Sequence, residues 1–340
     1  MTQPVRTAPT LAEVAAAAGV SRSTASRALN DSPRISEETK KRVRAAAKEV
    51  NFVPNARGRA LAVGRTEIIA VLVTEPLSEL FSDPTYSEFL SGITEELSES
   101  SYLPVILQAS STHERNRARE HFERCSFDAV IDVSPYKGSE LLEVLCELGV
   151  PTVLCGQLEG HPYRDVFSTV YSDDEEGGRL HALAMNGAGG REDQIVAVLG
   201  PQDNPAVVDR LRGYRAVLGE DLPDANVIYT GWNNGDGYQA MHQILAREIA
   251  FDGVLCGSDR IAAGVITALN EAGLSVPADI SVVGFDDHEI ATRCVPALTT
   301  VRQPLREEGH MAANIALDMI KGAEPTTSVM HMQLIQRDSL

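Results

Sequence analysis

The sequence predicts an α/β protein in which a small all-α helix-turn-helix unit precedes a larger body of two lobes. First, its 340 residues leave room for two or three domains of about 150 residues each. Second, residues 1–65 carry 12 Lys and Arg against 5 Asp and Glu, a net charge of +7, whereas the remainder carries 18 against 43, a net charge of −25. Third, short apolar runs alternate with helical stretches from Ile68 onward. That alternation is typical of parallel sheets covered by helices.

Composition excludes several classes of protein. A body of net charge −25 repels phosphates, so any contact with nucleic acid belongs to the basic N-terminal segment. The longer apolar runs, such as Ile68–Val73, are far shorter than the roughly 18 residues that cross a membrane, and no export signal follows Met1. The five cysteines form no CxxC pair, so we expect reduced thiols and a cytoplasmic protein rather than a disulfide framework.

The basic segment predicts three helices. Thr10-Leu11-Ala12-Glu13 has the pattern of a capping box at the start of the first. Ser21 is placed to cap a second helix over about 22–29, and Ser36 a third over 37–50. Two short helices joined by a three-residue turn that contains glycine form a helix-turn-helix.

The second helix carries residues suited to reading DNA. In a helix-turn-helix, the N-terminal residues of this helix face base edges in the major groove. Arg22, Ser23 and Arg27 are expected to point outward there, and an arginine fork can donate two hydrogen bonds to guanine O6 and N7. Three further hydroxyl residues are expected to contact phosphates or the helix backbone: Ser21, Thr24 and Ser26. A merely solvated surface position remains the alternative for any one of these residues.

Residues 53–65 connect the two parts. Pro54 ends the third helix, and only a short helix can follow, because Gly58 weakens it by about 1 kcal/mol relative to alanine. Isolated, such a helix is unstable and needs a partner to order it. Its candidate DNA contacts are Asn55, Arg57, Arg59 and Leu61. A leucine wedged into a minor-groove step between arginines kinks DNA, and a flexible linker is an equal alternative from the residues alone.

The motifs of this N-terminal part resemble the LacI/GalR family of bacterial repressors. The run Thr10–Asn30 is similar to the DNA-binding headpiece of that family, and Pro54–Leu61 is similar to its hinge helix. The resemblance places three residues on base-reading positions: Arg22, Ser23 and Arg27. It places Leu61 on the leucine that enters the minor groove, and Gly58 departs from the usual alanine.

The resemblance extends over the body. The motifs that carry it are Val170–Gly178, Asp209–Tyr214, Ser258–Asp259, Val282–Asp287 and Leu298–Pro304. The implied fold is that of periplasmic sugar-binding proteins, with two lobes joined by three crossovers. On this basis we expect a headpiece at 1–52, a hinge at 53–65 and an effector-binding and dimerisation domain at 66–340. The expected lobes are an N-lobe of about 66–171 and 301–326 and a C-lobe of about 172–300 and 327–340.

A small ligand is expected in the cleft between the lobes, at the carboxyl ends of the strands. The candidate ligand-binding residues are Tyr86, Asp174, Arg210, Trp232, Ser258, Asp286 and Gln303. Carboxylates and an arginine fork suit the hydroxyls of a sugar, and the only tryptophan, Trp232, can stack on its ring with Tyr86 opposite. Ser258 stands where some relatives carry asparagine, and Asp174 also replaces the common asparagine. Packing of Trp232 and a structural ion pair of Arg210 with Asp209 or Glu220 remain alternatives.

These observations predict a homodimeric, sequence-specific transcriptional repressor that binds double-stranded operator DNA under the control of a mono- or disaccharide. A purine- or nucleoside-responsive regulator and a co-repressor-dependent regulator are alternatives, while a sugar-binding transport protein conflicts with the basic headpiece. The sequence contains no GxSxG, HExxH, phosphate-loop or GxGxxG pattern, so we expect no enzyme activity, cofactor or metal. We expect a cytoplasmic, nucleoid-associated protein and, without a heptad-repeat tail, a dimer rather than a tetramer.

Overall fold

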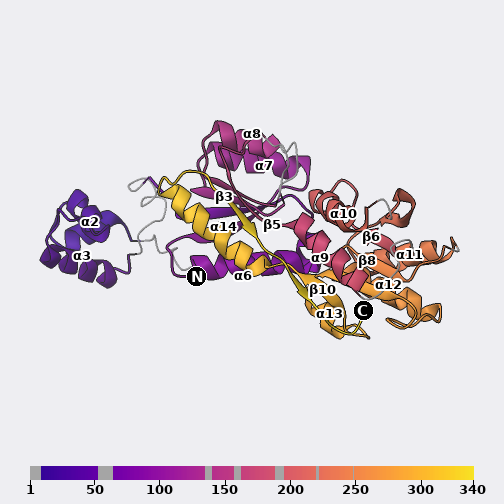
Figure 1. Cartoon of the computed structure of the whole chain (residues 1–340). Coiled ribbons are helices and arrows are strands. Elements are labelled where there is room, and N and C mark those ends of the chain that lie inside the picture. The colour runs from indigo at the N-terminus through magenta and orange to yellow at the C-terminus, as the bar shows by residue number, and fades with distance from the viewer. Residues whose placement is uncertain are drawn as a thin grey trace, which may run out of the picture. The chain divides into compact units, whose positions relative to one another are not determined.

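The computed structural model describes residues 9–52, 64–134, 140–156, 162–187, 195–219, 222–247 and 249–340. The chain forms two compact units, Met1–Glu67 and Ile68–Leu340 (Figure 1). Four predicted DNA contacts lie outside the described residues: Asn55, Arg57, Arg59 and Leu61. Within the described ranges, no helix is long and apolar enough to cross a lipid bilayer.

The described part of the N-terminal unit contains three helices, α1 (Leu11–Ala17), α2 (Arg22–Leu29) and α3 (Glu37–Glu49), which confirms the predicted headpiece fold. Each helix begins at the residue expected to cap it. The Glu13 amide donates to Thr10 Oγ1 at 3.4 Å and the Thr10 amide donates to Glu13 Oε2 at 2.6 Å, a complete capping box. Ser21 and Ser36 accept hydrogen bonds from the amides three residues further on, at 3.1 and 3.3 Å.

One apolar cluster holds these helices together. Gly19, at φ +63°, gives the chain the left-handed turn that follows α1. The buried members of the cluster are Val14, Ala15, Ala18, Ala25, Ala28, Val43, Ala46 and Ala47. Because most of them are alanines, the helices pack closely, and α2 is anchored by the buried Ala25 and Ala28 together with the partly buried Leu29. The opposite side of α2 is therefore left to solvent.

The first of two sheets in the body has six described strands, ordered β11-β5-β4-β3-β1-β2, and all adjacent pairs are parallel. In chain order these strands are β1 (Ile68–Val73), β2 (Leu103–Gln108), β3 (Ala129–Asp132), β4 (Thr152–Cys155), β5 (Ser168–Ser172) and β11 (Thr327–Met330). Alternate residues of β1 belong to the apolar clusters on opposite faces of the sheet. Burial on both faces explains why this strand is apolar throughout.

Helices cover both faces of this first sheet (Figure 1). On one face lie α5 (Leu77–Ser82), α6 (Pro84–Leu97) and α14 (Leu305–Ile320), and on the other α7 (Thr112–Glu123) and α8 (Glu140–Glu147). The N-terminus of α6 is capped by Asp83, which accepts a hydrogen bond from the Thr85 amide at 3.0 Å. This cap fixes the start of α6, on the side of the first lobe that faces the second lobe.

The second sheet also has six described strands, ordered β12-β10-β9-β8-β6-β7. They are β6 (Ile195–Leu199), β7 (Val227–Tyr229), β8 (Gly253–Cys256), β9 (Ser281–Asp286), β10 (Thr299–Arg302) and β12 (Gln333–Ile335), of which only β12 is antiparallel to its neighbour. One face of this second sheet is covered by α9 (Asp174–Gly187) and α10 (Pro205–Leu218), and the other face by α11 (Asn234–Leu245) and α12 (Asp259–Glu271). Two short helices complete the lobe, a 3₁₀ turn (Asp224–Asn226) and α13 (Glu289–Arg293).

The chain passes between the two sheets after β5, after β10 and after β11. This differs from the expected lobe boundaries at two places. Residues 327–330 were expected in the C-lobe, but β11 pairs with β5 in the first sheet. Residues 301 and 302 were expected in the N-lobe, but they belong to β10, which pairs with β9 in the second sheet. Neither segment shows a long apolar run, because edge positions and short strands need only a few buried residues.

Candidate functional site

The exposed side of α2 carries the predicted base-reading residues. Arg22, Ser23 and Arg27 are all exposed, and in the described part of the chain neither arginine side chain forms an ion pair. Ser21 caps the helix, and its hydroxyl also lies 2.8 Å from Thr24 Oγ1. Thr24 and Ser26 are only partly exposed. The helix therefore presents two unpaired guanidinium groups at its surface, as a major-groove reader requires.

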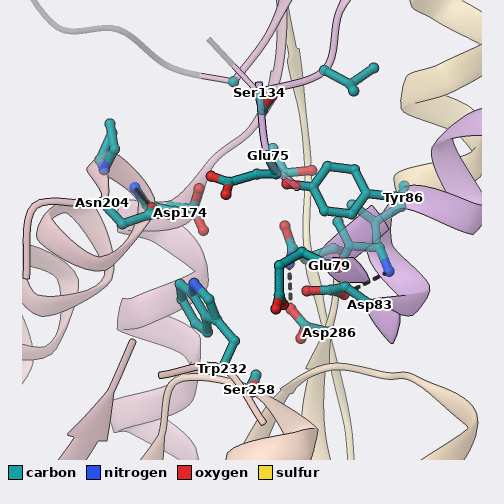
Figure 2. Close-up of a pocket in the computed structure, with 18 of the residues that line it drawn as sticks. Glu75, Glu79, Asp83, Tyr86, Ser134, Asp174, Asn204, Trp232, Ser258 and Asp286 are labelled. Atoms are coloured by element: carbon teal, nitrogen blue, oxygen red, sulfur yellow. Dashed lines mark hydrogen bonds between the residues drawn. The ribbon is translucent and has the colours of Figure 1, made fainter. Parts of the chain in front are cut away.

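A pocket of about 640 Å³ opens between the two lobes of the body. It is lined by every residue that the sequence analysis proposed for ligand binding: Tyr86, Asp174, Arg210, Trp232, Ser258, Asp286 and Gln303. Figure 2 shows Tyr86, on α6 of the first lobe, across the pocket from Trp232 and Asp174 of the second. Residues distant in sequence meet here because most of them follow the carboxyl ends of strands, which share one edge of each sheet.

Arg210 is the centre of the polar part of the pocket. Its side chain is buried, and its Nε donates to Asp174 Oδ1 at 2.7 Å. Its Nη1 donates to the carbonyl oxygen of Gly257 at 2.5 Å and lies 3.9 Å from Asp286 Oδ1. Its Cζ lies 3.7 Å from the ring centroid of Phe285, where the cation and the aromatic face attract each other. A structural ion pair with Asp209 or Glu220 remained an alternative for Arg210. In the described part of the chain its ion pairs are instead with Asp174 and Asp286, two other candidate ligand contacts.

Two glycines of the motifs bring Arg210 and Asp174 together. A Cβ atom at Gly178 of α9 would overlap the carbonyl oxygen of Arg210, and one at Gly213 of α10 would overlap that of Glu175. These two helices therefore pack with their backbones in contact, which places the Arg210 side chain beside the first residue of α9. Larger residues at either glycine would separate the ion pair.

Asp286 ends strand β9 with φ +107°, a conformation that is strained for a residue with a Cβ atom. Its Oδ1 accepts a hydrogen bond from Gln303 Nε2 at 2.5 Å, and its Oδ2 lies 3.7 Å from His288 Nδ1. Its neighbour Asp287 instead forms ion pairs with Arg302 and Arg337. The two adjacent carboxylates thus face different partners, and among the described residues no three side chains could together hold a metal ion.

Burial shifts the pKa values of Arg210, Asp174 and Asp286. It raises the pKa of Asp174 to about 6, against the opposing effect of Arg210. It also raises the pKa of Asp286, against His288 and Arg210. Although burial lowers the pKa of Arg210, the two carboxylates raise it above its ordinary value overall. The result is a buried, preorganised set of one cation and two carboxylates, which suits a neutral ligand with several hydroxyls.

Trp232 both packs and lines the pocket. It lies in the loop between β7 and α11 and contacts the apolar clusters on both faces of the second sheet. A Cβ atom at Gly200 would overlap its ring, so the indole lies directly on the backbone that follows β6. Ser258 is less available, because its Oγ caps α12 by accepting from the Ile261 amide at 3.2 Å.

Several pocket residues were not found by sequence reasoning. Of the described residues that line the pocket, eight are acidic and two are arginines; the acidic residues are Glu75, Glu79, Asp83, Asp174, Asp203, Asp236, Asp286 and Glu308. Arg260 of α12 forms an ion pair with Asp83 of the first lobe, and Thr85 Oγ1 lies 3.4 Å from His288 Nε2. These contacts link the lobes across the cleft. The Asp83-Pro84 pair marks a helix start in the sequence, but nothing there identifies its partner.

The fold and the site together define a class of protein: a helix-turn-helix unit followed by a two-lobed ligand-binding body. Residues 10–55 match the model of the "Bacterial regulatory proteins, lacI family", and residues 190–340 match the "Periplasmic binding protein-like domain". The chain is 35% identical over 339 residues to the HTH-type transcriptional regulator CelR of Thermobifida fusca, covering 98% of this chain and 99% of that protein. The chain therefore belongs to the LacI family of bacterial regulatory proteins.

Other relatives fall in the same family. The ribose operon repressor of Escherichia coli K12 is 31% identical, covering 96% of each chain. The HTH-type transcriptional repressor PurR of Pectobacterium atrosepticum is 32% identical, covering 97% of this chain and 96% of that protein. Among solved structures, a "transcriptional regulator CelR-cellobiose complex" has a TM-score of 0.76 and 34% identity, covering 98% of this chain and all of the other.

Proposed function

We propose that the protein is a homodimeric transcriptional repressor whose affinity for a pseudo-palindromic operator is controlled by a neutral sugar bound between the lobes. Each of two headpieces reads one half-site through Arg22, Ser23 and Arg27, because a single module offers too little contact for strong specificity. The repressor acts at the nucleoid, in the cytoplasm. Binding of the sugar closes the cleft and disfavours the ordered hinge, so the sugar and the operator weaken each other's binding to the same extent.

The observation that carries this proposal is the pocket lining. Tyr86 and Trp232 offer aromatic surfaces, and the Arg210 cluster with the surrounding carboxylates offers hydrogen-bond acceptors. Hydroxyl groups donate to such acceptors, whereas a sugar phosphate or another anion is disfavoured by a lining in which eight acidic residues face two arginines. A purine would use the aromatic surfaces but would leave most of the carboxylates without donors. CelR has been solved in complex with cellobiose, and the ribose operon repressor is named for ribose. Both relatives support a sugar as the effector.

The proposal is tested by fluorescence anisotropy with DNA from the promoter of the protein's own gene. Salt concentration is varied, and cellobiose, ribose, other mono- and disaccharides, and purines are titrated. We expect tight, salt-sensitive binding that one sugar reverses. If only a purine releases the DNA, the effector is a purine and not a sugar. If the ligand tightens DNA binding, it is a co-repressor. The absence of specific DNA binding would contradict the repressor function.

Leu61→Ala tests the proposed hinge contact. A leucine inserted at the centre of the operator would support a kink, so its loss is expected to weaken specific binding by roughly tenfold or more and to reduce DNA bending. Sugar affinity is expected to stay unchanged. The check is a gel-shift bending assay beside calorimetry with the sugar. If the variant bends DNA as the wild type does, Leu61 is not a wedge.

Arg260→Ala tests the link between the lobes. The substitution leaves Asp83 without its partner from the other lobe, so we expect a more open cleft and roughly tenfold weaker sugar binding. Small-angle X-ray scattering and calorimetry check the two effects. Arg293→Ala is the matched control, because Arg293 forms an exposed ion pair with Glu289 of its own helix. Equal effects of the two substitutions would contradict a role for the interlobe pair.

A further inference from the structure

One carboxyl group of the pocket differs from the others in its burial and partners. Glu308 lies in the first turn of α14, which follows the crossover after β10. It lines the pocket, yet only 2% of the residue is exposed. Its Oε2 accepts a hydrogen bond from Ser172 Oγ at 2.8 Å, at the end of β5. In the described part of the chain no other side chain bonds to it, so Oε1 is left for a ligand.

The surroundings of Glu308 contain no compensating cation among the described groups that affect it. Asp174 of α9 lies near enough to disfavour the charge of Glu308. Glu308 and the buried Asp132 of β3 both lie near the Cys155 thiol of β4. Tyr86 of α6 lines the same pocket. Burial raises the pKa of Glu308 to about 8, with Ser172 opposing the shift and Asp174 adding to it. At neutral pH the group is therefore mainly a neutral carboxylic acid, which accepts at one oxygen and donates at the other.

We propose that Glu308 contacts the effector directly, donating a hydrogen bond from Oε1 to a ring or glycosidic oxygen of the sugar. The proposal rests on the proposed function of the cleft as a sugar site. An ether oxygen accepts hydrogen bonds but cannot donate, so ionised carboxylates, which only accept, cannot serve it. The protonated Glu308 therefore favours a sugar, whose ether oxygens accept its hydrogen bond, over a ligand whose only polar groups are hydrogen-bond donors.

Calorimetric titration with cellobiose, or with ribose if only ribose binds, tests the contact. E308L removes the donor and is expected to weaken binding by about tenfold or more at pH 7, since a ligand acceptor and Ser172 both lose their partner. E308Q keeps a donor of similar shape and is expected to bind within about threefold of the wild type. The matched control is E307Q, because Glu307 is the adjacent residue of the same turn and is exposed.

The pH profile separates a ligand contact from a structural role. Wild-type affinity is expected to fall as the pH rises through about 8, because the donor becomes an acceptor, and E308Q is expected to lose this step. The other titratable groups around Glu308, namely Asp132, Asp174, Cys155 and Tyr86, are present in both proteins, so a step that only E308Q lacks is assigned to Glu308. This second measurement keeps the proposal testable if E308L does not fold.

The outcomes are distinguishable. If E308L binds the sugar as the wild type does, or if E308Q keeps the wild-type pH step, Glu308 is not a ligand contact while the cleft remains a sugar site. If no sugar binds the wild-type protein, the proposed function fails and this inference fails with it. An Arg210→Ala variant in the same titrations shows whether the cleft is the place of binding.

Discussion

Arg210→Ala is expected to abolish the response to the effector while operator binding persists. The guanidinium group holds Asp174 and Asp286 together and the residue is only 4% exposed, so its removal leaves Asp174 without its cation and Asp286 with His288 as its remaining basic neighbour. Losing one partner of a buried, hydrogen-bonded charge pair costs about 2–5 kcal/mol, which is at least about thirtyfold in affinity. The free energy of unfolding of the body should fall by about 3–5 kcal/mol for the same reason. Operator binding depends on the other unit and should be retained.

Sugar calorimetry, chemical denaturation and DNA anisotropy measure these three effects. Arg210→Lys keeps the charge but not the planar fork that bonds Asp174 and Gly257, so it should restore stability better than sugar affinity. Arg215→Ala controls for the loss of any arginine from α10, because Arg215 is exposed and pairs with Asp224. Sugar release of DNA by Arg210→Ala at wild-type concentrations would contradict the assignment.

Arg27→Ala is expected to weaken operator binding by about 1–3 kcal/mol per headpiece and to relax the preference at one base pair of each half-site. Because a dimer carries the change twice, the full operator should lose roughly 2–6 kcal/mol. The side chain is exposed on α2 and Ala25 and Ala28 anchor the helix, so the headpiece should keep its stability. Sugar affinity of the body should be unchanged.

Anisotropy with a set of operators, each substituted at one base pair, measures the preference. Arg34→Ala is the control, since it removes one exposed positive charge from the same unit outside the recognition helix. It should lower affinity for all sequences alike and reduce the salt dependence, without changing the preference. Unaltered discrimination in Arg27→Ala would remove this residue from base reading.

Local signals made much of the fold predictable. The caps at Thr10, Ser21 and Ser36 involve only neighbouring residues, and the helices begin where these caps indicate. The run Ile68–Val73 matches β1 because a strand buried on both faces must be apolar throughout. In contrast, β11 has the sequence Thr-Ser-Val-Met and lies at a sheet edge, where its pairing with β5 depends on contacts distant in sequence.

The pocket was predictable to a similar extent and for a similar reason. Six of its seven predicted residues lie near strand ends or helix starts, so their position follows from local structure; Arg210, inside α10, was found from its motif. The Asp83–Arg260 pair was missed because its members come from different lobes. Glu307 and Glu308 are adjacent and identical in type, yet one is exposed and the other is buried. Only the packing of α14 against the first sheet distinguishes them.

Because the chain crosses between the lobes, each sheet contains a strand that is synthesised late, and this constrains how the protein folds during synthesis. During synthesis, β5 emerges well over a hundred residues before β11, its parallel neighbour, so the edge of the first sheet stays unpaired on the ribosome for almost half of translation. The described apolar cluster of the headpiece is made of residues between Leu11 and Phe52, so the headpiece can fold early in synthesis. An exposed strand edge invites pairing with another chain, and such partly folded species aggregate. Nascent chains of this protein should therefore be clients of chaperones until β11 has been synthesised, and a stop codon just before β11 should yield insoluble protein rather than a soluble two-lobed body.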